Sequence, residues 1–132
     1  MGAEPFRHVV PYQENVQRAL DDLRLEVFRT GEYDGAGNGA ESPDDALDMA
    51  SADGTRSILD IQHVSSYPDL GCAAPLSEDE LQRYFGTSTP TVAQIESSDA
   101  FWNDIERGSA RYVVIDEGGR PAKLFFAGYS LD

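Results

Sequence analysis

Two side chains in the segment SILDIQHV, residues 57–64, are the best candidates for chemistry in this sequence. Asp60 is a carboxylate in an otherwise apolar run, and His63 is one of only two histidines. A carboxylate and an imidazole can serve together as general acid and base. However, the alternating pattern predicts a central strand, on which residues three apart point to opposite faces. A pair of Asp60 and His63 would need a bulge, so both are weak catalytic candidates, and we expect no cofactor.

A carboxylate inside a strand needs a partner, because an isolated buried charge is costly. Arg56 and Arg111 are the candidate partners of Asp60, and a structural salt bridge is the favoured interpretation. For His63, a half-buried histidine is favoured over a catalytic base. If a cleft beside the sheet instead joined Asp60 and His63 with Arg56 and Tyr67, the protein would be a small enzyme or a small-molecule-binding domain.

The only cysteine is Cys72, so the chain can form no internal disulfide. This favours a reducing compartment, and we expect the protein in the cytoplasm. Cys72 could form a nucleophile–base pair with His63 or His8, but no basic residue near it in sequence would lower its pKa. A small buried or loop thiol is the favoured interpretation. Two histidines and one cysteine are also too few for a four-ligand zinc site without carboxylates.

The glycine-rich segment 31–41 matches a calcium-binding EF-hand loop only in part. When Gly39 is placed at the loop glycine, Asp34, Asn38 and Asp45 fall at ligand positions. Ala36 occupies another ligand position and Pro43 intrudes, so these three residues are only weak calcium candidates. We expect residues 31–41 to form a flexible loop.

The acidic residues are concentrated in the middle of the chain. Residues 30–82 hold twelve acids and one base, a net charge of −11 out of −14 for the whole chain. Such a field repels nucleic acid and anionic membranes and attracts basic partners, although it also serves solubility. The leading hypothesis is a small acidic intracellular binding protein, such as an inhibitor or immunity-type protein for a basic protein partner. Its predicted contact residues are Asp44, Asp45, Asp48, Asp53, Glu78, Asp79, Phe125 and Tyr129.

With 132 residues the chain is expected to form a single globular α+β domain, residues 1–132. Helices are predicted over 13–29 and after the polar starts at Ser42, Ser77, Thr91 and Ser98. Strands are predicted over 7–12, 57–64, 111–116 and 123–129, the last two as a C-terminal hairpin. The predicted fold is a small, mainly antiparallel sheet of three or four strands, with the helices packed on it.

The terminal segment KLFFAGY, residues 123–129, is apolar on both of its faces. Either helices cover both faces of the sheet, or Phe125 and Tyr129 contact a partner. A homodimer through the C-terminal hairpin and a structural subunit of an oligomeric assembly therefore remain alternatives. No apolar run approaches the roughly 20 residues of a membrane helix. Residues 1–30 also lack the apolar core of a signal peptide, and we expect none.

Overall fold

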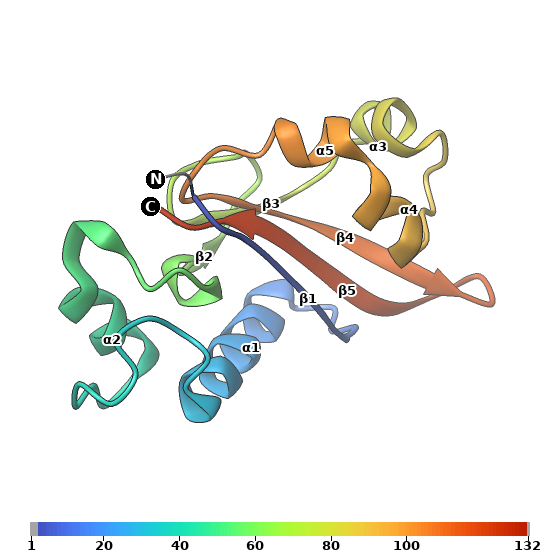
Figure 1. Ribbon diagram of the computed structural model, residues 1–132. Helices are drawn as coiled ribbons and strands as arrows, with labels where there is room; N and C mark the ends of the chain where they lie inside the picture. Colours follow the sequence, from blue (N-terminus) through green and yellow to red (C-terminus); the bar gives the residue numbers. More distant parts are fainter. Residues whose placement is uncertain (1–2, 132) are drawn as a thin grey trace.

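Five strands form one mixed sheet in the order β1-β5-β4-β3-β2 (Figure 1). The computed structural model describes residues 3–131. The antiparallel part joins β1 to β5 and β5 to β4, and the parallel part joins β4 to β3 and β3 to β2. The strands are β1 (Pro5–Pro11), β2 (His63–Val64), β3 (Cys72–Pro75), β4 (Ala110–Glu117) and β5 (Arg120–Tyr129).

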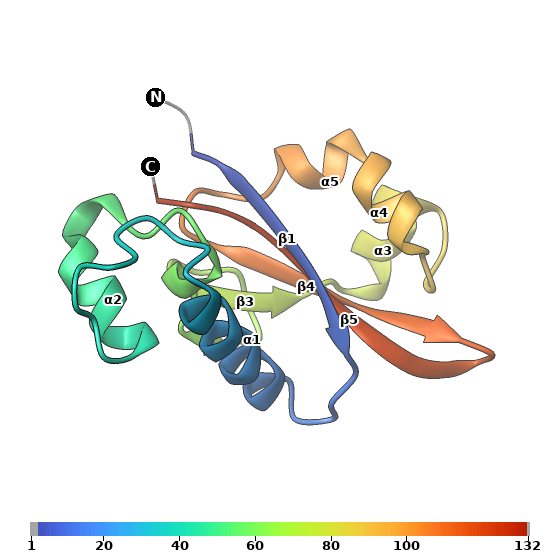
Figure 2. The same ribbon diagram turned by 60° about the horizontal axis from the view of Figure 1, so that its bottom comes forward.

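Helices cover both faces of this sheet (Figures 1 and 2). One face carries α1 (Val16–Thr30) and α2 (Pro43–Ala50), and the other carries α3 (Glu78–Phe85), α4 (Val92–Ser97) and α5 (Asp99–Asn103). The predicted helix starts are confirmed, because the side chains of Ser42, Ser77, Thr91 and Ser98 each accept a backbone N–H of the first turn. Within residues 3–131, none of these helices has the length and apolarity needed to cross a membrane.

The double-sided apolar pattern of the last strand follows from these two helical layers. Leu124 and Phe126 of β5 lie in the core beneath α1, whereas Phe125 and Ala127 lie in the core beneath α4 and α5. All four side chains are fully buried. The terminal segment is therefore a central strand of the sheet, with β1 on one side and β4 on the other.

The α+β class is confirmed, but the prediction of a mainly antiparallel sheet of three or four strands is wrong. Residues 57–64 do not form a central strand. The Ser57 hydroxyl accepts the N–H of Leu59, and the Asp60 carboxylate accepts the N–H of Thr55. These local bonds turn the chain into a short 3₁₀ helix, η2 (Ile58–Asp60), and leave only His63–Val64 as strand β2.

The sheet also differs from the prediction through β3, because no strand was predicted over residues 72–75. Ala73 and Ala74 are completely buried, yet small residues give little strand signal. All three helices α3, α4 and α5 lie between β3 and β4 in the chain. A connection of this length allows β3 to pair with β4 in parallel, which a tight turn does not.

The lowered pKa of the half-buried His8 should make the stability of the protein depend on pH. His8 lies on β1 opposite Phe126, and burial lowers its pKa, although the charge of Glu32 opposes this shift. A lowered histidine pKa means that the unfolded chain binds the proton first as the pH falls. We therefore expect the free energy of unfolding to decrease between pH 7.5 and 5.5 (a window set by the unperturbed histidine pKa).

The measurement is urea unfolding at both pH values in the native protein and in His8→Leu. The substitution removes the half-buried histidine and should therefore flatten the pH dependence over this window. The exposed His63 is the same in both proteins and does not affect the comparison. An equally steep decrease in His8→Leu would show that another group is responsible.

Candidate functional site

A pocket with an acidic lining lies where α2 meets the loops at one end of the sheet. We call it the α2 pocket, and its volume is about 360 Å³. Its lining combines leucines, glycines, two carboxylates and two neutral polar side chains: Leu47, Asp48, Ser51, Asp60, Gln62, Leu70, Gly71, Gly108 and Leu131. It therefore draws on segments that are far apart in the sequence.

Asp60 is held rigidly in the wall of this pocket. Its side chain is only 3% exposed, and Oδ1 accepts the Thr55 N–H at 2.7 Å and the Thr55 hydroxyl at 2.8 Å. Within residues 3–131, its second oxygen, Oδ2, accepts one hydrogen bond, a long one of 3.4 Å from the Leu131 N–H. Gly54 packs directly on Oδ2, since a Cβ there would lie 2.6 Å away. The carboxylate therefore has a fixed orientation and spare acceptor capacity on Oδ2.

No cationic side chain neutralises Asp60 within residues 3–131. The two arginines suggested by the sequence have other partners. Arg56 pairs with Glu4 and Asp34, and Arg111 pairs with Glu80. The α2 pocket also has no Lys, Arg or His in its lining, whereas Asp48 adds an exposed second carboxylate. A buried carboxylate without a counter-charge favours a cationic ligand.

The shape of the α2 pocket indicates which kind of cation fits. Leu47, Leu70 and Leu131 supply apolar walls that suit the aliphatic part of an organic cation. Across residues 3–131, no cluster of three or more His, Cys, Asp or Glu side chains could hold a metal ion. An alkylammonium or guanidinium group carried on a methylene chain matches this arrangement of walls and carboxylates.

The four residues proposed for a catalytic cleft do not converge. Asp60 lines the α2 pocket, but His63, Arg56 and Tyr67 do not. The Tyr67 side chain is 80% exposed. His63 is exposed on β2 opposite Cys72 of β3, and the half-buried Cys72 is a free thiol. No hydrogen bond joins His63 to Asp60 or to Cys72 within the described part of the chain.

The three calcium candidates do not share one cavity. Asp34 and Asn38 line a small cavity of about 30 Å³ beside α2. Asp45 is not in its lining, since the Asp45 carboxylate accepts the backbone N–H of Glu41. Asp34 is further committed to Arg56, with an N–O distance of 3.4 Å. The carboxylates of Asp34 and Asp45 are thus used in contacts within the protein itself.

The acidic middle of the chain divides between the two faces of the sheet (Figures 1 and 2). Glu78 and Asp79 belong to the first turn of α3, on the face opposite to α2. Around α2, Asp44 is occupied by the buried Arg24 at 2.9 Å, and hydrogen bonds from Arg24 and Gln62 hold the pKa of Asp44 below its usual value. Asp48, which lines the pocket, and Asp53 remain exposed.

The two aromatic residues suggested for partner contact differ in exposure. Phe125 is completely buried in the domain's own core. Tyr129 is half-buried, and its ring meets that of Trp102 edge-on at 6.1 Å. Phe125 is therefore inaccessible to a partner.

Several pocket residues carry no signal in the sequence. Ser51 follows α2 with φ 57° and ψ −140°, a strained conformation for a residue with a side chain. Gly71, Gly108 and Leu131 come from three separate segments, and only the fold brings them to Asp60.

Compared with known proteins, the chain matches no protein-family model, no curated protein and no solved structure.

Proposed function

We propose that this protein is a small acidic binding protein whose α2 pocket receives a cationic side chain of a basic protein partner. The observation that carries the proposal is Asp60, a carboxylate 3% exposed that faces a pocket and has no counter-cation in residues 3–131. A lysine or arginine side chain would place its stem on the leucines and its charge on Oδ2. The single cysteine fits a cytoplasmic site of action.

The surrounding charge supports the same proposal. The net charge of −14 attracts a basic partner over long range. The exposed Asp48 lines the pocket, and the exposed Asp53 lies two residues after Ser51 of the lining. Electrostatic steering of this kind raises the association rate and weakens as salt is added. An inhibitor or immunity-type protein against a basic enzyme would use its carboxylates in this way.

Neutralising Asp60 should weaken binding of a simple cation to the pocket. We expect n-butylammonium or Nα-acetyl-lysine methylamide, titrated and followed by NMR, to shift the amide signals of Gln62, Gly71 and Gly108. Asp60→Asn should raise the dissociation constant at least about 10-fold, since a buried charge is removed. Asp48→Asn should raise it by about 2- to 3-fold, because exposed charges contribute less.

The matched control is Asp53→Asn, which removes the same charge from an exposed acid outside the pocket lining. It should change the dissociation constant by less than about 2-fold. Equal affinity in native protein and Asp60→Asn, or shifts scattered over the acidic surface in all variants, would contradict the proposal.

A small-molecule amine receptor is the second candidate. The volume of the α2 pocket, about 360 Å³, lies in the range of small-ligand sites. The two functions differ in the surface that they bury. A free amine should bind with an affinity that depends only on the pocket, whereas a protein partner should also lose affinity when Met49, an exposed residue of α2 outside the pocket lining, is replaced by serine.

A further inference from the structure

The edge of β4 is left open where β3 ends. The parallel pairing of β3 with β4 stops at Pro75, which lies opposite Tyr112, while β4 continues to Glu117. The Tyr129 N–H donates to the Ser109 carbonyl, so the odd-numbered residues of β4 bond to β5. The N–H and C=O groups of Val114 therefore point the other way, past the end of β3.

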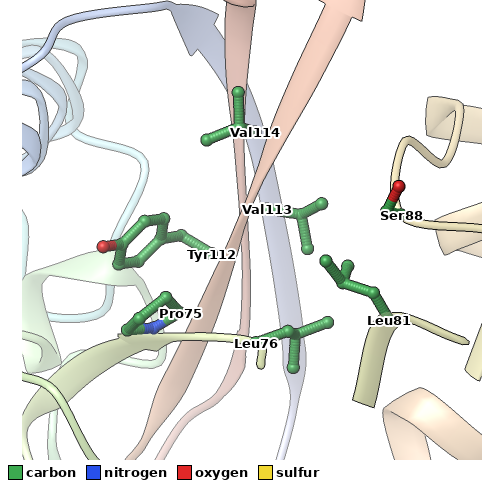
Figure 3. Close-up of a pocket in the computed structure, with 7 residues that line it drawn as sticks. All are labelled: Pro75, Leu76, Leu81, Ser88, Tyr112, Val113 and Val114. Atoms are coloured by element: carbon green, nitrogen blue, oxygen red, sulfur yellow. The ribbon is translucent and has the colours of Figure 1, made fainter. Parts of the chain in front are cut away.

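A groove lies at the place where a longer β3 would continue (Figure 3). We call it the β4 edge groove; its volume is about 120 Å³. Leu81 of α3 and Ser88 of the loop after it form the wall across from β4. The lining is mainly apolar: Pro75, Leu76, Leu81, Ser88, Tyr112, Val113 and Val114. The groove thus offers room for one apolar side chain next to unpaired backbone groups.

The two outer edges of the sheet carry features that disfavour a further strand. The outer edge of β1 starts and ends with Pro5 and Pro11, which have no N–H to donate, and β2 has only two residues. Proline and short length are common ways of protecting an edge from a further strand. The edge of β4 beyond Pro75 has neither protection.

We propose that the β4 edge groove binds an extended, basic peptide segment of a partner as an additional strand. The unpaired groups of Val114 require an extended backbone, and the apolar lining accepts alternate side chains. The negative charge of the acidic residues around the groove favours a basic segment. Asp116 follows Val114 on β4, and Glu78 and Asp79 begin α3; none of the three forms an ion pair within residues 3–131. A second copy of this chain also has a net charge of −14, so electrostatic repulsion disfavours it as the occupant of this edge.

The test follows amide hydrogen exchange and NMR shifts in the Asp60→Asn protein, so that lysine binding in the α2 pocket contributes little. In the free protein, the Val114 amide should exchange at least about 10-fold faster than those of Val113 and Ile115, which donate to β5. The peptide acetyl-Lys-Val-Lys-Val-Lys-Val-Lys-amide should slow the exchange of Val114 and shift its signal. The same peptide with every backbone nitrogen methylated should bind at least about 10-fold more weakly, since it cannot donate to the edge.

Two proline variants sharpen the test. Val114→Pro removes the outward N–H and should abolish binding of the peptide, whereas the matched control Val9→Pro, at the outer edge of β1, should leave it unchanged. If Val114→Pro does not fold, the comparison of the methylated with the unmethylated peptide still tests the proposal. Equal binding of both peptides, or a Val114 amide as protected as its neighbours in the free protein, would overturn the proposal. Protection of Val114 that grows with protein concentration alone would assign the edge to a second copy and overturn it too.

Discussion

Gly128→Ala should destabilise the protein by about 3 kcal/mol or more, a lowering of the melting temperature on the order of 10 °C. Gly128 lies in the middle of the sheet, opposite Phe6 on β1 and Ala110 on β4. A Cβ at this position would lie 2.5 Å from Cζ of the Phe6 ring and 2.7 Å from the carbonyl oxygen of Ser109. The ring could move, but the carbonyl belongs to the backbone of the segment that enters β4. Thermal and urea unfolding measure the effect.

The variant Phe6→Leu provides the control for this prediction. A smaller side chain at position 6 relieves the contact with the ring but not the contact with Ser109. The double variant Phe6→Leu/Gly128→Ala should therefore be more stable than the sum of the two single effects, with a coupling of about 1 kcal/mol. A Gly128→Ala protein within about 0.5 kcal/mol of the native one would show that β5 can shift away from Phe6 at little cost.

Arg111→Met should cost about 3–5 kcal/mol, because it leaves a partly buried carboxylate and two carbonyls without their donor. The Arg111 side chain is 8% exposed, and its guanidinium forms two hydrogen bonds with Glu80, at 2.9 and 3.2 Å. It also donates to the carbonyls of Ala74 and Pro75. One side chain thus ties β4 to the end of β3 and to α3.

Replacing Glu80 as well should restore part of this loss. Burial alone would raise the pKa of Glu80, but hydrogen bonds from Arg111 and Ser77 hold it below its usual value. The ion pair therefore stabilises the fold above the normal pKa of a glutamate and is lost on acidification. Arg111→Met/Glu80→Gln should recover at least about 1 kcal/mol relative to Arg111→Met at pH 7. No recovery would mean that the two carbonyls account for the whole cost.

The helices were predictable because their signals are local. Ser77 with Glu80, and Thr91 with Gln94, form the reciprocal side-chain bonds of a capping box, and Gly31 ends α1 with φ 75°. The hairpin of β4 and β5 was likewise visible from its two apolar runs and the Gly118-Gly119 turn. Each of these features depends on residues close together in sequence.

The rest of the sheet could not be predicted because long-range contacts decide it. Residues 57–64 alternate like a strand, but the Thr55 N–H donates to Asp60 and the Leu59 N–H donates to the Ser57 hydroxyl, and these bonds turn the chain at Ile58. Ala73 and Ala74 gain their place in β3 only through pairing with β4. The sequence did single out Asp60 as a carboxylate that needs a partner. Its partners are not arginines but the Thr55 hydroxyl and the backbone N–H groups of Thr55 and Leu131. Only the folded chain brings these donors to Asp60.

The division of the acidic residues changes how a basic partner would be recognised. The residues 30–82 look like one charged segment, yet α2 and α3 lie on opposite faces of the sheet. Asp44 and Glu80, which the sequence presents as surface charges, neutralise Arg24 and Arg111. The charge left near Asp60 is therefore smaller and more local than the total suggests, and the pocket carries the specificity in our proposal.

The most direct test of the central claim is to locate a bound cation by intermolecular nuclear Overhauser effects. With n-butylammonium bound to the native protein, we expect contacts from the butyl protons to the methyl groups of Leu47, Leu70 and Leu131, and the loss of these contacts in Asp60→Asn. Contacts confined to exposed acids elsewhere, or the same contacts at the same affinity in Asp60→Asn, would contradict the assignment of Asp60 as the cation-binding group.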